Sequence, residues 1–271
     1  MFKAKYVFFG TPEFAAIILT KLIEASMPPV ALVCNPDRPA GRKRIITPPE
    51  TKVIAEKNNI PIFQPESLKD VKNQLEKLQA DFFLVAAYAK IIHKDILSIP
   101  KSGTIGIHPS LLPRHRGATP IQNTILSGDE IGGVTLYLID EKVDHGPILN
   151  GEAVKIRENE NYESLEKKLA ELGADLFIKI IPDYLLGKIK PQIQNEEYAT
   201  YTKKLKTEDA FVDLEKDDPI SIERKVRALN PEPGAWMMQN NKRVKILKAE
   251  IVEGKLKLTK IQAEGGKPKD L

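Results

Sequence analysis

Short β-rich runs alternate with helical patterns along the first two thirds of this chain, and this alternation is the feature that most limits its fold. The run YVFFG (6–10) has the apolar character of a buried strand, and apolar residues at helical spacing follow it. Strands separated by helices are typical of a parallel sheet with both faces covered. We therefore predict an α/β fold with a doubly wound, mostly parallel sheet. Further strands are predicted at 29–34, 61–63, 81–88, 104–108 and 133–139, and helices at 14–22, 50–59, 67–79, 119–128 and 161–186.

The last third of the chain has a different pattern. One short helix is predicted at 219–229, and short β runs follow it near WMMQ, RVKILKAEIV and KLKLTKIQ. Short strands with turn signals are typical of a small β-barrel. We expect a first domain over residues 1–188, a linker over 189–206 and a C-terminal β domain over 207–271.

Composition excludes several classes of protein. The chain is 42% hydrophobic and 29% charged, which is ordinary for a globular protein. No apolar run approaches the length of a membrane span, and the start MFKAKYVFFG lacks the features of a secretory signal. Cys34 is the only cysteine, so a disulfide framework or a thiolate metal cluster within one chain is excluded. We expect a cytoplasmic protein without a membrane partner.

Positive charge is unevenly placed along the chain. The net charge is +4, yet nine Lys or Arg stand against three acids between Lys242 and Lys269. A second basic cluster is Arg42, Lys43 and Arg44, and a third is Arg114 with Arg116. Three basic patches suit a polyanionic partner such as a nucleic acid. For the C-terminal patch the alternative of a lysine-rich surface that serves solubility stays open.

Candidate chemical groups follow three of the predicted strands. The first strand–helix turn reads GTPEF and lacks the dinucleotide-binding pattern. Ligands of open α/β sheets bind at the carboxyl ends of strands, where His108, the loop containing Asp144 and the segment AAYAKII (86–92) are found. A histidine hydrogen-bonded to an aspartate suits removal of a proton from an amine that attacks a carbonyl. A structural histidine is the alternative for His108 taken alone.

The segment SLLP (110–113) is the second candidate feature. Its leucines fall in a loop at the expected cleft, where exposed leucines line flat apolar or aromatic ligands. The alternative is that Pro113 and Gly117 simply shape a turn. No metal site is expected, because the four histidines lack ligand spacing, and Cys34 has no predicted histidine beside it for nucleophilic catalysis. The histidines are His93, His108, His115 and His145.

Several separate motifs, in order, resemble the folate-dependent formyltransferases. HPSLLPRHRGATPIQ is similar to that family's histidine signature, and GVTLYLIDEKVDHGPIL to its second signature, which ends in an aspartate. FFGTPEFA and NPDRPAGRKR resemble the branch of the family that acts on tRNA, in which the latter loop is an insertion. ADFFLVAAYAKIIHKDIL and YATYTKKL fit the same pattern, so the resemblance runs from about residue 5 to 250.

The resemblance implies a formyltransferase or Rossmann-like first domain and an oligonucleotide-binding (OB-like) barrel at the C-terminus. The implied reaction moves a formyl group from 10-formyltetrahydrofolate to the α-amino group of methionine on initiator tRNA, for translation initiation. His108 and Asp144 match the family's catalytic pair, and Arg42, with Lys43 and Arg44, matches the loop that contacts the tRNA acceptor arm. The implied partners are initiator methionyl-tRNA and folate, bound to a monomer without metal.

The resemblance also implies where folate binds. The pterin would lie against the backbone of Ala87–Ile92 and against the loop Asp140–Asp144, and SLLP would line the rest of the folate. The expected contacts are Ser110, Leu111, Leu112, Pro113, Tyr88, Ile91, Asp140 and Val143.

Two departures from the family pattern matter. The family's catalytic asparagine stands two residues before the histidine, where this chain has Gly106, so a hydrogen bond to the developing formyl oxygen needs another donor. Gln122, Asn123, a backbone N–H or a water are the candidates. The chain also stops at Leu271, before the family's usual final strands, so the C-terminal domain is expected to be short. The alternatives that stay open are a formyltransferase for a small amine, such as an amino-sugar nucleotide, and a weakened tRNA- or folate-binding homologue.

Overall fold

The computed structural model describes residues 4–41 and 44–271, and these divide into two compact units. The first unit comprises Met1–Arg116, Gly133–Ala153 and Lys167–Thr200. The second comprises Gly117–Gly132, Val154–Glu166 and Tyr201–Leu271. The candidate catalytic residues all belong to the first unit.

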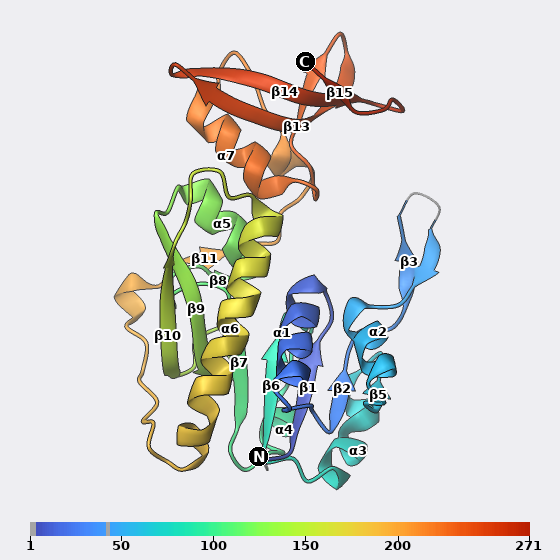
Figure 1. Cartoon of the computed structure of the whole chain (residues 1–271), viewed down its shortest axis with the longest axis vertical. Coiled ribbons are helices and arrows are strands. Elements are labelled where there is room, and N and C mark those ends of the chain that lie inside the picture. The colour runs from blue at the N-terminus through green and yellow to red at the C-terminus, as the bar shows by residue number, and fades with distance from the viewer. Residues whose placement is uncertain (1–3, 42–43) are drawn as a thin grey trace. The chain divides into compact units, whose positions relative to one another are not determined.

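A seven-stranded sheet forms the centre of the first unit (Figure 1). Its strands run in the order β10-β9-β7-β6-β1-β2-β5, so that chain order reverses beside β1. The pairs β1–β2, β1–β6, β2–β5 and β6–β7 are parallel, whereas β7 and β9 are antiparallel. The strands are β1 (Tyr6–Gly10), β2 (Ala31–Val33), β5 (Ile62–Phe63), β6 (Phe82–Ala86), β7 (Thr104–His108), β9 (Ile131–Leu138) and β10 (Ile148–Lys155).

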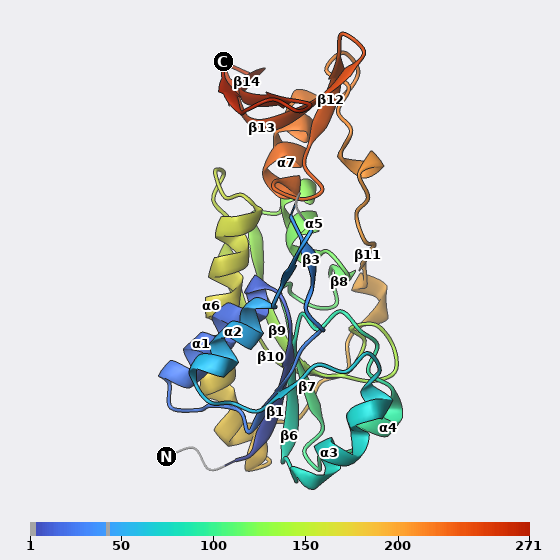
Figure 2. The same ribbon diagram turned by 90° about the vertical axis from the view of Figure 1, so that its right-hand side faces the viewer.

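The central strands are apolar throughout because helices cover both faces of the sheet. Every residue of β1 is buried, and Tyr6 stacks on Phe82 of β6 with ring centroids 5.1 Å apart. Figure 2 shows α1 (Glu13–Glu24), α2 (Glu50–Lys57) and α6 (Tyr162–Leu185) on one face, with α3 (Lys72–Lys77) and α4 (Lys94–Leu97) on the other. The predicted α/β class with a mostly parallel sheet is therefore confirmed.

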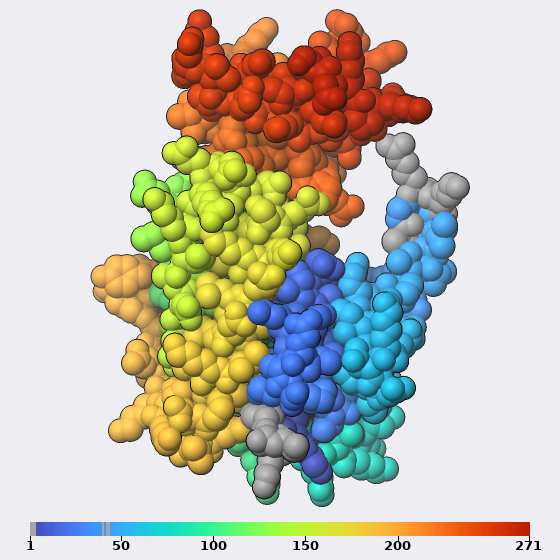
Figure 3. Space-filling model, in the orientation of Figure 1, coloured from blue at the N-terminus to red at the C-terminus, as the bar shows by residue number. Residues whose placement is uncertain are grey.

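The helices of the first face pack closely on the sheet and on each other. Phe14, Ile18 and Leu22 of α1 are buried at helical spacing. Gly173 lets α6 approach β7, because a Cβ at this glycine would lie 2.7 Å from Cγ2 of Ile107. The surfaces of α1 and α6 meet in Figure 3, and Lys21 pairs there with Asp175 at 3.0 Å. Successive residues of a strand point to opposite faces, so Gly106 and His108, on either side of Ile107 in β7, lie on the face of the sheet away from α6.

Two local expectations were wrong, and a third segment, the expected linker, contains secondary structure of its own. The predicted loop 35–49 contains a hairpin of β3 (Arg38–Ala40) and β4 (Ile45–Thr47). Strand β10 was missed because its sequence ILNGEAVK carries polar residues at consecutive positions, which suits an edge strand and hides the alternation. The expected linker 189–206 contains a turn of 3₁₀ helix (Glu196–Tyr198) and strand β11 (Tyr201–Thr202), which pairs with β8 (Arg116–Gly117).

The second unit contains a four-stranded antiparallel sheet. Its order is β12-β13-β14-β15, with β12 and β15 at the edges, and Ile222 and Val226 of α7 (Pro219–Leu229) belong to the same apolar cluster as Val244 and Ile246. The strands are β12 (Trp236–Gln239), β13 (Lys242–Val252), β14 (Lys255–Ala263) and β15 (Lys269–Asp270). A small C-terminal domain of the β-barrel type was predicted; the C-terminal β domain is confirmed, and its strands form this four-stranded antiparallel sheet. Asp218 caps α7 by accepting a hydrogen bond from the backbone N–H of Ser221.

No helix in the described ranges combines the length and apolar character of a membrane span.

Candidate active site

Strand β7 presents His108 on the face of the sheet opposite to α6. The imidazole is buried, with 6% of the residue exposed. Its Nε2 lies 2.9 Å from the backbone oxygen of His115. A carbonyl oxygen carries no hydrogen, so Nε2 must be the donor and Nδ1 is the nitrogen able to accept a proton. The loop that follows β7 therefore sets the tautomer of His108.

Asp144, which lies in the second signature motif GVTLYLIDEKVDHGPIL, has its carboxylate close to His108. Its Oδ2 lies 3.7 Å from Nδ1 of His108, so the two predicted site residues are brought together. The predicted reason, two strand ends at one edge of the sheet, was wrong. Because β9 is antiparallel to β7 and Leu138 pairs with Ile105, the end of β9 lies beside the start of β7. The 139–147 loop must fold back across the face of β7 to place Asp144 at the histidine.

Tyr137 is the third member of this cluster and was not predicted. Its hydroxyl donates to Oδ1 of Asp144 at 2.6 Å, and its ring meets that of His108 edge-on, with centroids 6.3 Å apart. Burial, and next the charge of Asp144, hold the pKa of Tyr137 well above its ordinary value, so the hydroxyl stays protonated. Tyr137 is also the cross-strand partner of Gly106.

Arg116 supports the loop that contains Asp144 through hydrogen bonds to Gln194. The expectation that Arg116 contributes to a basic surface patch was wrong, because the residue is fully buried. Its guanidinium donates to Oε1 of Gln194 at 2.8 and 3.1 Å and to the carboxylate of Glu196 at 2.7 and 3.0 Å. Gln194 in turn donates to the carbonyls of Asp144 and Gly146 at 2.9 and 2.8 Å. Arg114, its partner in the predicted patch, is exposed.

A chain of polar contacts continues from this arginine to Asp140. His145 Nε2 lies 3.7 Å from Glu196, and its Nδ1 lies 2.6 Å from Oδ2 of Asp140. The other oxygen of Asp140 accepts from the backbone N–H of Lys142 at 2.9 Å. The hydrogen bond from Arg116 holds the pKa of Glu196 below its ordinary value. These contacts tie both ends of the Asp140–Asp144 loop to the rest of the unit.

The SLLP segment is fixed by β9. Thr135 donates to the backbone oxygen of Ser110 at 2.7 Å and accepts from the N–H of Leu112 at 3.0 Å. Ser110 and Leu112 are buried, so the expectation of fully exposed leucines was wrong for Leu112. Leu111 and Pro113 are half-buried. Leu111 lies against Gly133, where a Cβ would come within 2.6 Å of its Cδ2. Leu111 and Pro113 are thus the apolar side chains that this segment offers to a ligand.

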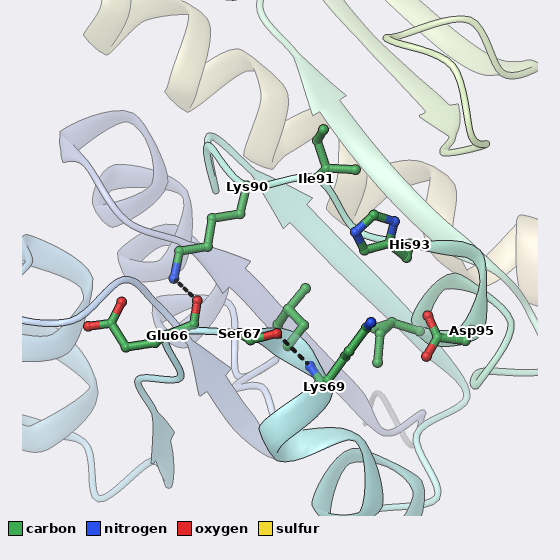
Figure 4. Close-up of a pocket in the computed structure, with 9 residues that line it drawn as sticks. Glu66, Ser67, Lys69, Lys90, Ile91, His93 and Asp95 are labelled. Carbon is green, nitrogen blue, oxygen red and sulfur yellow. Dashed lines mark hydrogen bonds between the residues drawn. The ribbon is translucent and has the colours of Figure 1, made fainter.

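The segment after β6 divides between core and surface. Tyr88 is buried and its ring meets that of Phe9 edge-on, with centroids 5.5 Å apart, so the predicted contact of this segment with folate depends on the backbone. Its carbonyl accepts from Nδ2 of Asn35 at 3.2 Å. Ile91 is 80% exposed and lines a cavity of about 140 Å³ together with His93 and Lys90. Figure 4 shows Lys90 turned toward the backbone carbonyl of Glu66, to which its ammonium group donates a hydrogen bond at 3.0 Å.

The remaining predicted positions lie at the surface or outside the description. Val143 is exposed in the loop before Asp144. Arg44 is exposed in the β3–β4 hairpin, and Arg42 and Lys43 lie outside the described residues. The base of this hairpin is held by Asp37, which pairs with Lys52 at 2.8 Å, and this contact lowers the pKa of Asp37.

Other candidate chemistries find little support. Nowhere in the ranges 4–41 and 44–271 do three His, Cys, Asp or Glu residues come together as a metal site would require. Burial raises the pKa of Cys34 to about 11, which keeps the thiol protonated and a poor nucleophile. The amide of Asn123 donates to the carbonyl and hydroxyl of Thr119 at 2.8 and 2.9 Å, so it is engaged within its own helix α5 (Pro120–Ser127).

The sequence carried weak signals for the residues that were missed. Tyr137 stands at an inward position of a predicted strand, where a polar aromatic residue requires a hydrogen-bond partner. Arg116 and Gln194 are 78 residues apart, and nothing local indicates that they meet. The site as a whole is a buried histidine facing a carboxylate that is held by a tyrosine and by a supported loop. Such a group can accept and return a proton.

Comparison with known proteins shows which families and proteins the chain is similar to. Residues 4–181 match the family described as "Formyl transferase", and residues 204–268 match "Formyl transferase, C-terminal domain". The methionyl-tRNA formyltransferase of Halorhodospira halophila is 42% identical over 253 residues, which cover 93% of this chain and 81% of that protein.

Solved structures share the fold at lower identity. The methionyl-tRNA formyltransferase from Clostridium thermocellum superposes with a TM-score of 0.66 at 17% identity, covering 96% of this chain and 99% of that one. HypX from Aquifex aeolicus in complex with tetrahydrofolic acid gives a TM-score of 0.70 at 17% identity, covering 98% of this chain and 46% of that one.

Proposed function

The chain belongs to the formyl transferase family and formylates initiator methionyl-tRNA, and on this premise we propose that 10-formyltetrahydrofolate is the donor and that His108 and Asp144 carry the proton transfer. The observation that carries the proposal is the orientation of His108. Its Nε2 is committed to the carbonyl of His115 at 2.9 Å, and its Nδ1 faces Asp144 at 3.7 Å. A folate derivative bound by a protein of the same fold supports the choice of donor.

The proposed reaction keeps its protons in balance. The amine of the methionyl group bonds to the formyl carbon and loses one proton, which Nδ1 of His108 accepts. Asp144 stabilises the imidazolium that results. The bond between the formyl carbon and the folate nitrogen then breaks, and His108 returns the proton to that nitrogen. The imidazole ends in its starting state, ready for the next cycle.

The folate is proposed to lie between the SLLP segment and the loops after β6 and β9. Leu111, Pro113 and Ile91 offer apolar surface, and so does the exposed side chain of Val143. Ser110, Leu112 and Tyr88 act through the backbone or by supporting their neighbours, since their side chains are buried. Asp140 shapes its loop through Lys142 and His145.

The tRNA is proposed to contact lysines on the sheet of the second unit. Lys248 and Lys260 are direct cross-strand partners of β13 and β14, and the ion pair of Lys260 with Asp270 at 3.5 Å offsets only part of the repulsion between these like charges. A polyanion relieves this repulsion and gains contacts to both ammonium groups. Arg42, Lys43 and Arg44 are proposed to bind the acceptor arm. The division at residues 188 and 206, the cytoplasmic location and the monomeric state stay predictions.

A single-turnover assay tests the donor and the acceptor together. The protein is mixed with 10-formyltetrahydrofolate and either methionyl-initiator tRNA or an amino-sugar nucleotide, and the formylated product is measured. We expect fast transfer to the tRNA and negligible transfer to the sugar nucleotide. The reverse preference would assign the chain to small-amine formylation, and absence of transfer to both, with folate still bound, would indicate the weakened homologue.

A further inference from the structure

Gly106 and Tyr137 share one space on the face of the sheet. They are direct partners in the β7–β9 pairing. A Cβ built on Gly106 would lie 2.4 Å from Cε1 of Tyr137, 2.7 Å from its Cζ and 3.0 Å from its hydroxyl oxygen. Such approaches are not compatible with a side chain, so the tyrosine ring lies over the glycine. The residue at position 106 and the residue at position 137 must therefore change together.

The hydroxyl of Tyr137 has one hydrogen, which it donates in a hydrogen bond to Asp144. The distance from this hydroxyl to Oδ1 of Asp144 is 2.6 Å, the value of a strong bond to an ionised acceptor. A hydroxyl engaged in this way cannot also donate to a substrate oxygen. Tyr137 therefore acts through Asp144, and it does not act on the formyl group directly.

The two oxygens of Asp144 are thereby given different tasks. Oδ1 is held by Tyr137, and Oδ2 is the oxygen that lies 3.7 Å from Nδ1 of His108. The ring of Tyr137 meets the imidazole at 82°, so the same side chain limits the tilt of His108. One residue thus sets the position of both members of the proton-transfer pair.

We propose that Tyr137 is the positioning residue of this active site: its ring fills the space that a side chain at position 106 would occupy, and its hydroxyl holds Asp144. The inference rests on the proposed roles of His108 and Asp144. It means that a glycine at position 106 is what the ring of Tyr137 requires, whereas the donor to the formyl oxygen must come from another group.

Tyr137→Phe is the first test, because it removes the hydroxyl and keeps the ring. We expect kcat for formylation of methionyl-tRNA to fall by about 10- to 100-fold, as the loss of a hydrogen bond to a charged group predicts, with both KM values unchanged. Tyr184→Phe is the matched control, since its hydroxyl donates to the carbonyl of Ser102 at 2.7 Å, away from His108 and Asp144. A kcat within twofold of the wild type for Tyr137→Phe would overturn the proposal.

An exchange of the two residues is the second test. Gly106→Asn alone is expected to abolish transfer and lower the melting temperature, because the new side chain collides with the ring. Tyr137→Leu alone is expected to lower kcat, because Asp144 loses its donor. The double variant restores space for the new amide and removes the collision, so its kcat and melting temperature should exceed those of Gly106→Asn. A double variant no better than Gly106→Asn would contradict the coupling of the two positions.

His108→Ala separates this inference from the proposed function. Near-normal transfer by His108→Ala would reject the proposed role of His108 and Asp144, and with it the inference about Tyr137. Loss of transfer by His108→Ala together with a normal Tyr137→Phe would leave the pair in place and reject only the role of Tyr137.

Discussion

Both Nε and Nη2 of Arg116 donate to one atom, Oε1 of Gln194, at 3.1 and 2.8 Å. This double contact orients the amide of Gln194 so that its nitrogen faces the carbonyls of Asp144 and Gly146. The backbone that carries the carboxylate of Asp144 is therefore fixed through a buried arginine on a different segment. Arg116 and Asp144 belong to separate signatures, and Gln194 links the two in this structure.

Arg116→Ala is expected to lower both stability and activity. The substitution leaves a cavity and an unpaired, buried Gln194, a combination that costs about 2–4 kcal/mol of unfolding free energy. The loop with Asp144 then loses its support, so kcat falls while KM for tRNA changes little. Urea unfolding and steady-state kinetics measure the two effects. Arg114→Ala, an exposed neighbour, should cost less than about 1 kcal/mol, and equal losses for the two variants would contradict the structural role.

The pair of Arg116 and Glu196 predicts a pH dependence of stability. Arg116 lowers the pKa of Glu196 below its ordinary value of 4.5. A carboxyl group whose pKa is lower in the folded protein stabilises the fold above its unfolded pKa, and this contribution disappears as the pH falls through the folded pKa. Glu196→Gln should therefore show a smaller decrease in melting temperature below pH 4.5 than the wild type does. Superimposable curves of melting temperature against pH would argue against the pair.

His108→Ala and Asp144→Asn are expected to differ in degree. Removing the imidazole removes the base, and transfer should fall by about 10²- to 10⁴-fold. The amide of Asp144→Asn keeps an oxygen for Tyr137 but loses the charge that stabilises the imidazolium, so a smaller fall in kcat is expected. Binding of a folate analogue, measured by titration calorimetry, should stay within about threefold for both variants. A folate-binding defect as large as the loss of transfer would make His108 a binding residue.

The strands of the first unit could be predicted from sequence because of how they are buried. Strands such as YVFFG are covered on both faces, so an unbroken apolar run identifies them without knowledge of their neighbours. The direction of β9 could not be predicted, because pairing partners are set by register and by the return of β10, which composition does not record. The motifs predicted that His108 and Asp144 come together, as they do, whereas the topological argument for their proximity failed.

The residues that hold the site in place could not be predicted from the sequence, for a different reason. Arg116 reads as a surface charge, and only contacts with Gln194 and Glu196, 78 and 80 residues away, make its burial possible. In the sequence, Gly106 indicated only that the side chain of the family's asparagine is absent. The tyrosine that lies above it is a cross-strand partner 31 positions later (137 − 106), a relationship that exists only once β7 and β9 are paired. Residues that act through long-range partners are the ones that local patterns do not reveal.

Lys248→Gln is expected to affect tRNA binding and stability in opposite directions. Lys248 is exposed on β13 directly opposite Lys260, which also pairs with Asp270, so removing the charge of Lys248 relieves the remaining repulsion within the sheet. The unfolding free energy should rise by about 0.2–0.5 kcal/mol. If both lysines bind tRNA phosphates, KM for methionyl-tRNA should rise several-fold, and the slope of log affinity against log salt should shrink by about 0.7–0.9.

Lys179→Gln provides the matched control for this variant, because it removes the same charge from an exposed position on α6. The control should leave both KM for tRNA and the salt slope unchanged, which excludes an effect of net charge alone. KM for 10-formyltetrahydrofolate should be unaffected in both variants. Because stabilisation and loss of affinity have opposite signs, general damage to the fold cannot produce the expected pair of results. A Lys248→Gln protein that gains stability but keeps its affinity and salt slope would mean that this lysine pair does not contact the tRNA.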